Sequence, residues 1–266
     1  MGWDHLEAQL KRKSNTDPIQ VIPFVTVGFP NLDATLELVQ ALVQSGAAAV
    51  ELGVPFSDPL AEGTTIQKSS FHALNQGVTL SDCLGVAAEL RRRGTRVPLV
   101  LMGYYNPFLN YGLEAVAEKA KEVGVDGFII PDLPVEETAP ILEACSRHDI
   151  ALIPLLAPTS TDERIKEACA SARGFIYCVS LLGVTGARVD PSPEAAILVQ
   201  KVRHNTSLPL ALGFGISRKE QIDALANSVD AVVVGSALVD VIANTSQDEQ
   251  ISKVKAFMQG LGAITQ

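Results

Sequence analysis

The feature that most constrains the fold of this chain is a repeated alternation of short apolar runs and longer amphipathic segments. Eight runs rich in Val, Ile, Leu and Ala recur at a spacing of roughly 25 to 35 residues, and each is followed by a segment with helical periodicity. Short, uniformly apolar runs are typical of strands buried on both faces of a parallel sheet. The runs are 21–27, 48–53, 99–102, 127–130, 151–155, 175–179, 208–213 and 231–235.

The segments between the runs are predicted to be helices. They are 32–44, 80–92, 113–122, 136–147, 162–172, 193–203 and 218–226, with 237–243 and 249–259 closing the chain. Residues suited to N-caps precede several of them, namely Asn31, Ser81, Thr161, Ser192 and Ser217, and glycines follow helix ends at Gly46, Gly94 and Gly124.

Strand followed by helix, repeated eight times without an obvious linker, predicts a parallel sheet closed into a (β/α)8 TIM barrel. We expect one barrel domain over residues 1–266, with extra helices at the N-terminus and in the loops. An open doubly wound sheet is the alternative. It would place a glycine-rich phosphate turn after the first strand, and Gly28-Phe29-Pro30 is not such a turn.

Charge and composition exclude several classes of function. The formal net charge of -9 argues against nucleic-acid binding, and the one dense basic run, 91–93, is predicted to complement a helix C-terminus. The four cysteines show no metal-ligand spacing and are expected to be reduced. Neither a signal peptide nor a bilayer-spanning run is present, so we expect a cytoplasmic protein without a membrane partner.

One acidic residue lies inside an apolar run. Glu51 follows four small apolar residues, where a strand should bury carbon. A buried carboxylate costs several kcal/mol unless it is paired, hydrogen-bonded or protonated. Barrel active sites lie at the C-terminal ends of the strands and in the loops that follow, so Glu51 is predicted to be catalytic. A structural salt bridge is the alternative.

Other candidate residues follow the second, third and fourth runs. Asp58 and Glu62 lie in the loop after the second run, where Asp58 could instead cap a turn. Pro131-Asp132-Leu133-Pro134 holds an acid in a stiffened loop, although turn formation explains these residues equally well. Tyr104 and Tyr105 follow the third run, and one phenol is expected either to face the barrel mouth or to pack in the core.

Glycine is concentrated after the last three runs, in 183–186, 213–217 and 235–237. Backbone N–H groups exposed by glycine, with the N-terminus of a short helix near Ser236, form an anion site. The sequence therefore predicts a small phosphorylated substrate whose other end lies beside Glu51. Since no Walker lysine, dinucleotide fingerprint or metal cluster is present, we expect proton transfer by carboxylates, with neither metal nor cofactor.

Six motifs, in order and over nearly the whole chain, resemble the α-subunit family of tryptophan synthase. They are ELGVPFSDPLAEG with IQ following, LMGYYNP, PDLP, GVTG after YCVS, GFGIS, and VVVGSA. The resemblance implies a (β/α)8 barrel that cleaves indole-3-glycerol phosphate into indole and glyceraldehyde 3-phosphate without a cofactor. It also implies a complex, usually α2β2, with a β subunit that condenses the indole with serine.

The resemblance also implies roles for individual residues. Glu51 would be the general acid–base that protonates indole C3 and helps to deprotonate the glycerol hydroxyl, for which a raised pKa is needed. The other implied positions are Phe24, Tyr104 and Phe214 around the indole, Tyr177 near the glycerol, Gly186, Gly215, Gly235 and Ser236 at the phosphate, Thr185 on a loop that closes over Glu51, and Asp58 on the loop facing the partner.

One departure from the family pattern falls in the second loop. The family has an aspartate followed by Gly-Pro, whereas this chain has Glu62-Gly63-Thr64. The aspartate is expected to accept a hydrogen bond from the indole N–H, and glutamate adds one methylene. Either the pocket is rearranged around Glu62, or the enzyme is slower, or its substrate differs. Loss of the proline is expected to make the loop more mobile.

Three other functions remain open at the level of sequence. The chain could be a catalytically weakened relative that binds and regulates a β subunit through the Asp58 loop. It could supply indole to a different pathway. A third possibility is another phosphate-handling barrel enzyme, such as an isomerase.

Overall fold

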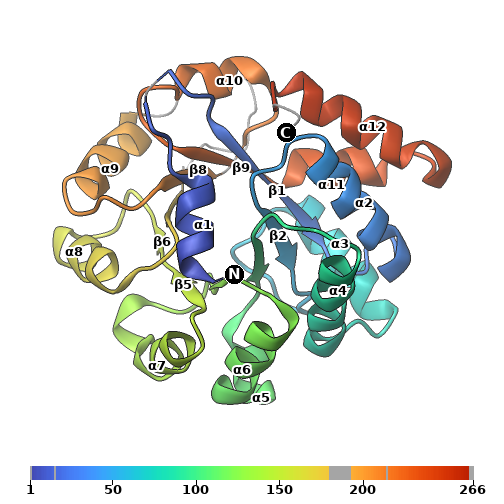
Figure 1. Cartoon of the computed structure of the whole chain (residues 1–266), viewed down its shortest axis with the longest axis horizontal. Coiled ribbons are helices and arrows are strands. Elements are labelled where there is room, and N and C mark those ends of the chain that lie inside the picture. The colour runs from blue at the N-terminus through green and yellow to red at the C-terminus, as the bar shows by residue number, and fades with distance from the viewer. Residues whose placement is uncertain (1, 15, 180–192, 214, 264–266) are drawn as a thin grey trace.

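The fold is a barrel of parallel strands surrounded by helices (Figure 1). A computed structural model describes residues 2–14, 16–179, 193–213 and 215–263. The strands follow one another around the barrel in the order β5-β4-β3-β2-β1-β9-β8-β7-β6. They are β1 (Gln20–Thr26), β2 (Val50–Gly53), β3 (Leu99–Met102), β4 (Gly127–Ile129), β5 (Ala151–Ile153), β6 (Leu155–Leu156), β7 (Ile176–Val179), β8 (Leu210–Gly213) and β9 (Ala231–Val234).

The fifth strand of the barrel is interrupted at Pro154. The segment β5 pairs with β4, β6 pairs with β7, and a single residue separates them. Together they occupy one position in an eight-stranded parallel barrel. The predicted fold class is confirmed, but the continuous strand predicted for 151–155 is wrong, because proline has no N–H to donate to a ladder.

Helices surround the barrel, most of them as an outer ring and α1 across one end (Figure 1). They are α1 (Trp3–Leu10), α2 (Leu32–Gln44), α3 (Thr64–Asn75), α4 (Leu80–Arg92), α5 (Tyr105–Tyr111), α6 (Leu113–Val123), the 3-10 helix η1 (Val135–Glu137), α7 (Ala139–Arg147), α8 (Asp162–Ser171), α9 (Pro193–Arg203), α10 (Lys219–Ala224), α11 (Ser236–Ala243) and α12 (Gln247–Gly260). Three of them, α1, α3 and α5, lie outside the predicted helical segments, at the N-terminus and in the loops. The segment predicted as one helix over 136–147 is divided between η1 and α7.

Most of the predicted helix boundaries that can be checked are confirmed. Asn31 and Thr161 accept hydrogen bonds from the first turns of α2 and α8. The glycines Gly46, Gly94 and Gly124 have φ of +91°, +88° and +80°, as expected for residues that follow helix ends.

Two predicted N-caps are wrong, and a third lies outside the described residues. The cap of α4 is Thr79, not Ser81, because Thr79 and Asp82 form a reciprocal capping box. The residue before α10 is Arg218 rather than Ser217. The remaining prediction, Ser192, cannot be compared with the structure.

Apolar side chains form two layers of core. The barrel interior is filled by residues such as Ile22, Val100 and Phe175, which contact one another inside the sheet. A larger cluster fills the space between the sheet and the helices and includes Leu52 and Phe128. The alternation of side chains along each strand divides them between these two layers.

Helix α1 closes the N-terminal end of the barrel (Figure 1). Its Leu6 and Leu10 are fully buried against the interior cluster. The buried carboxylate of Asp126 accepts a hydrogen bond from the backbone N–H of Gly2 at 2.8 Å and forms an ion pair with Arg91 at 2.7 Å. The N-terminal end of the barrel is therefore closed by α1, and the residue before this helix is hydrogen-bonded to Asp126 of the barrel.

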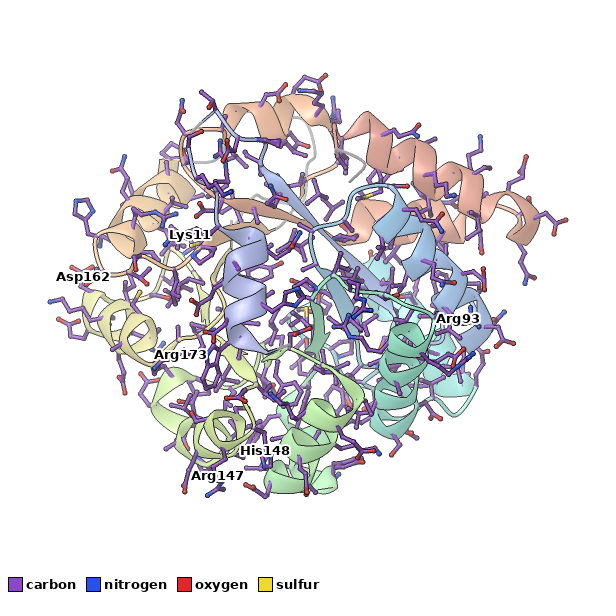
Figure 2. All side chains as sticks on the ribbon, in the orientation of Figure 1. Lys11, Arg93, Arg147, His148, Asp162 and Arg173 are labelled. Atoms are coloured by element: carbon purple, nitrogen blue, oxygen red, sulfur yellow. The ribbon has the colours of Figure 1, made fainter. Side chains whose placement is uncertain are left out.

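The arginines at the end of α4 serve the fold. Arg91 donates hydrogen bonds to the carbonyl oxygens of Gly124, Thr95 and Val97. Arg92 and Arg93 pair with Glu89 of the same helix, and Figure 2 shows Arg93 on the outside of the ring, well separated from Arg147 and Arg173. Arg91 and Arg92 lie in the last turn of α4, where the sequence predicts a helix C-terminus, and all three arginines have partners within the fold.

No helix in the described part of the chain combines the length and the apolar character needed to cross a membrane.

Candidate active site

Glu51 lies inside the barrel on β2, with its side chain fully buried. It is in register with Phe24 of β1 and Val100 of β3. Neither carboxyl oxygen has a hydrogen-bond partner among the described residues. Burial, and then the charge of Glu62, raise the pKa of Glu51 well above its usual value. The raised pKa favours the protonated form of the carboxyl group, which can donate a proton. The salt-bridge alternative receives no support from these contacts.

Tyr177 of β7 also lies inside the barrel, close enough for the charge of Glu51 to affect its pKa. Burial, followed by the charges of Glu51 and Glu62, raises the pKa of the Tyr177 phenol well above its usual value. A Cβ atom on Gly213 of the neighbouring strand would lie 2.1 Å from the phenol oxygen. Gly213 thus makes room for this ring, and the phenol stays protonated and able to donate a hydrogen bond.

A second glycine makes room for Phe24 in the same way. A Cβ atom on Gly53 would lie 2.4 Å from the Phe24 ring, which therefore extends over β2. Phe24 lines a small cavity of about 20 Å³ together with Ile66, Tyr104 and Glu62. Phe24 and Tyr104, which the resemblance assigns to the indole, thus line the same cavity. The role of the two glycines was not predicted, because it depends on strand register.

Glu62 lies at the barrel mouth in the loop between β2 and α3. It lines both the small cavity beside Phe24 and a larger mouth cavity of about 500 Å³, which also reaches Tyr177. Burial raises the pKa of Glu62 to about 7. This carboxyl group can therefore change its protonation state near neutral pH, close to the buried acid Glu51.

The departure at Thr64 coincides with the start of a helix. Thr64 is the first residue of α3, and the preceding Gly63 is extended, with φ -72° and ψ 165°. Proline is favoured at a first helical position, and the residue before proline favours this extended conformation. The backbone here thus has the shape that a proline would require, although the chain has threonine.

Tyr104 fixes the loop that carries Glu62. Its hydroxyl oxygen accepts a hydrogen bond of 2.8 Å from the backbone N–H of Ala61, and its ring stacks on Phe56 with centroids 4.9 Å apart. Burial raises the pKa of Tyr104 to about 12. Tyr104 therefore contributes both to the wall of the small cavity and to the position of the loop.

Asp58 lies on the outer surface of the same loop. It is exposed and accepts a hydrogen bond of 2.6 Å from the hydroxyl of Ser57. Leu60, close by, is 90% exposed. An exposed acid next to an exposed leucine makes this loop a candidate contact surface for another protein.

Asp132 has a structural role that the sequence did not reveal. Its carboxylate accepts a hydrogen bond of 2.8 Å from the backbone N–H of Tyr105, the first residue of α5. The acid of the fourth loop therefore caps a helix that follows the third strand. Tyr105 lies at the start of that helix.

The predicted phosphate glycines lie at the ends of β8 and β9. Gly235 is the N-cap of α11, and Ser236 is its first residue and is exposed. Gly215 has a φ of +77°, and its carbonyl oxygen accepts a hydrogen bond from the Gln221 amide. The first N–H groups of a helix have no intrahelical partner, so they remain available to an anion.

Three predicted site residues cannot be compared with the structure. Thr185, Gly186 and Phe214 lie outside the described residues. Within the described ranges, no group of three or more His, Cys, Asp or Glu side chains is placed to hold a metal ion. The cysteines Cys83, Cys145, Cys169 and Cys178 are buried and free.

Comparison with known proteins decides the family. The sequence model of the family described as "Tryptophan synthase alpha chain" matches residues 8–265. The chain belongs to the tryptophan synthase alpha chain family. A tryptophan synthase alpha chain from Chloroflexus aggregans is 46% identical over 255 residues, which cover 96% of each chain. Another, from Halalkalibacterium halodurans, is 41% identical over 264 residues, covering 96% of this chain and 98% of the relative.

Solved structures of the family agree with the fold. A chain from the tryptophan synthase α2β2 complex of Pyrococcus furiosus superposes with a TM-score of 0.86 at 38% identity, covering 92% of this chain and 98% of that one. A second structure of the tryptophan synthase α subunit from that organism gives a TM-score of 0.85 at 37% identity, with the same coverage of both chains. Membership of the tryptophan synthase alpha chain family thus rests on both sequence and structure.

Proposed function

We propose that this chain is a carbon–carbon lyase of tryptophan biosynthesis, which cleaves indole-3-glycerol phosphate into indole and glyceraldehyde 3-phosphate. Membership of the tryptophan synthase alpha chain family carries this assignment. The buried carboxyl group of Glu51, which lies inside the barrel on β2 without a hydrogen-bond partner among the described residues, agrees with it, because this reaction needs an acid that can also act as a base.

The proposed reaction begins with proton transfer from Glu51 to C3 of the indole ring. Protonation places positive charge on the ring nitrogen, and the ionised carboxylate of Glu62 accepts a hydrogen bond from the ring N–H. Glu51, now ionised, takes the proton from the hydroxyl on the carbon attached to C3. The bond between that carbon and C3 then breaks, its electron pair returns to the ring, and the carbon becomes the aldehyde.

The remaining residues are proposed to hold the substrate. Phe24, Tyr104 and Phe214 would border the indole, and the Tyr177 phenol would donate to the glycerol portion. The proposed phosphate ligands are the backbone N–H groups at Gly186, Gly215, Gly235 and Ser236, and Thr185 is proposed to lie on a closing loop. An anion at this position would benefit from the positive end of the α11 dipole.

A β subunit is the proposed partner. The relative from Pyrococcus furiosus is part of an α2β2 complex, which supports a partner of this kind. Exposed Asp58 and Leu60 lie on a loop whose other end carries Glu62, so a protein that contacts this loop could influence the site. We also propose that residues 1–266 act as one barrel domain.

The proposed reaction can be tested directly. The purified chain is incubated with indole-3-glycerol phosphate, with and without a tryptophan synthase β subunit, and indole is measured. We expect indole in both reactions and a faster rate with the β subunit. No indole in either reaction would exclude the lyase. Binding of the β subunit without lyase activity would instead favour the alternative of a catalytically weakened relative that regulates a β subunit. The geometry of the described residues does not point to that alternative.

A further inference from the structure

The mouth cavity extends beyond the barrel interior. It is lined by residues from both faces of the interrupted fifth strand. Ile153 and Leu155 belong to the interior layer, whereas Leu152 and Leu156 belong to the layer between the sheet and the helices. Since the cavity touches both faces of this strand, it extends past the strand from the interior layer to the layer between the sheet and the helices.

The opening lies between the end of β4 and β6. The ladder between β4 and β5 stops at the pair Ile129 and Ile153. The next residue of the fifth strand is Pro154, which has no N–H to continue the ladder. Ile130 and Pro131 at the end of β4 line the cavity, as does Pro154. No ladder therefore joins the two strands at this point, and we call this part of the wall the slot.

Beyond the slot, the cavity continues under η1, α7 and α8. We call this part the side lobe, and its apolar walls are Val135, Leu142, Leu152, Leu156 and Ala168. Ala168 and Leu156 are almost completely buried, and Leu142 is half-buried. The side lobe is thus an apolar space built into the protein and connected to the mouth.

Polar groups along the side lobe already have partners within the protein. The Thr138 hydroxyl donates to the carbonyl oxygen of Val135 at 2.8 Å, and the Ser171 hydroxyl donates to that of Glu167 at 3.1 Å. Arg164 pairs with Glu136 at 2.7 Å. A guest in the side lobe would gain apolar contacts and few hydrogen bonds, which favours an uncharged apolar molecule.

The side lobe lies across the barrel from the proposed phosphate site. In the strand order, β9 is separated from β4 by β1, β2 and β3 on one side, which places them opposite each other. A substrate whose phosphate is held at Gly235 and whose ring lies near Phe24 and Glu51 leaves the side lobe empty. Cleavage frees the ring from that anchor.

We propose that the side lobe is a second binding site, which receives the uncharged planar aromatic product, indole, after its bond to the phosphorylated fragment is broken. This inference rests on the proposed function. The slot between β4 and β6 provides the route, and the side lobe provides apolar contact on several sides. The phosphorylated product is excluded from it by its charge.

The site can be tested by crystallography of the full chain soaked with 5-bromoindole, in which anomalous scattering locates the bromine. We expect bromine in the side lobe, in contact with Leu142 and Ala168. Leu142→Phe should fill the space and remove this peak. The control Leu113→Phe enlarges another half-buried leucine, on α6 and away from the cavity walls, and should keep the peak. Bromine found only beside Tyr177, or nowhere, overturns the proposal.

Equilibrium dialysis of indole against the same proteins tests the site in solution. The wild-type chain should bind one more indole molecule than Leu142→Phe does, and Leu113→Phe should match the wild type. Binding seen at crystal concentration only overturns the proposal. If Leu142→Phe does not fold, Ala168→Val narrows the side lobe from the other wall. These measurements require no turnover, so loss of the site and absence of lyase activity are distinguishable.

Discussion

Burial and the charge of Glu62 act on the Glu51 carboxyl in the same direction, and both keep its proton in place. Replacing Glu51 with glutamine preserves the shape of the side chain and removes the transferable proton. We expect Glu51→Gln to lower kcat by a factor of about 10² to 10⁴ or more, the usual contribution of a general acid–base. Binding of glyceraldehyde 3-phosphate, measured by calorimetry, should remain.

Glu118→Gln is the matched control for this substitution, because Glu118 is exposed on α6. It should leave both kcat and binding unchanged. Turnover of Glu51→Gln at the wild-type rate would remove Glu51 from the proposed catalytic role.

Glu62 is expected to control the acidic side of the pH profile. Its pKa is raised by burial to about 7, and the ionised form is the one that accepts the indole N–H. The value of kcat/KM should therefore rise as the pH increases through about 7. Glu62→Asp has a lower intrinsic pKa and a shorter reach, so we expect the rise at lower pH and a plateau roughly 10-fold or more below the wild type.

The pH profiles of the wild type and of Glu62→Asp also show whether the pocket has adapted to glutamate or still fits the aspartate of the family pattern. A faster Glu62→Asp enzyme would mean that the pocket still fits aspartate and that Glu62 is a simple departure from the family pattern. An unchanged profile would show that another group is responsible for the acidic limb.

At the scale of elements, the start of α3 is a place where the chain can be stabilised. Gly63 already has the extended backbone that precedes proline, and Thr64 occupies the first helical position. Thr64→Pro should raise the free energy of unfolding by about 0.4–1 kcal/mol, because it restricts the unfolded chain. Chemical denaturation measures the change. Thr64→Ala is the control and should not stabilise; loss of stability in Thr64→Pro would show that the backbone cannot accept proline.

Elements with a clear apolar pattern could be predicted from the sequence. The run 99–102 and the segments 32–44, 80–92 and 193–203 match their strand and helices to the residue. Helix α3 was missed because its sequence, TTIQKSSFHALN, buries few apolar side chains and begins without a side-chain cap. Helix α5 was missed because its N-terminus is capped from a different loop, by Asp132. Contacts between distant segments have no local signature.

The candidate site could be predicted where a residue type did not fit its local sequence pattern. Glu51 stood out because it is an acid in an apolar run, and Glu62 followed from its loop. The two glycines that admit Phe24 and Tyr177 were not predicted in that role, because it depends on which residues lie opposite each other on neighbouring strands. The slot beside Pro154 depends on the same register.

At the scale of the whole molecule, Asp126 connects the N-terminal segment to the barrel. Asp126→Asn removes the charge that pairs with Arg91 and weakens the acceptor of the Gly2 N–H. Breaking a buried pair of this kind should lower the free energy of unfolding by about 3–5 kcal/mol. Thermal denaturation should show a lower Tm, while kcat at low temperature stays unchanged, since this end of the barrel is opposite the active site.

Asp162→Asn is the control, because Asp162 forms an exposed ion pair with Lys201. Its effect should stay within about 0.5 kcal/mol. Figure 2 shows Asp162 at the outer rim of the molecule. Equal loss of stability in Asp126→Asn and Asp162→Asn would mean that the buried Asp126 carboxylate contributes no more to stability than an exposed ion pair does.

Helix α1 closes the N-terminal end of the barrel (Figure 1). Leu6 and Leu10 fill the base, so in the proposed reaction the substrate and products would not pass through this end of the barrel. A subunit bound over the C-terminal ends of the strands would cover the opening of the site. Indole could not escape through the N-terminal end of the barrel, which α1 closes. If the proposed β subunit binds at the C-terminal ends of the strands, the closed base leaves the product one direction of exit, toward the partner.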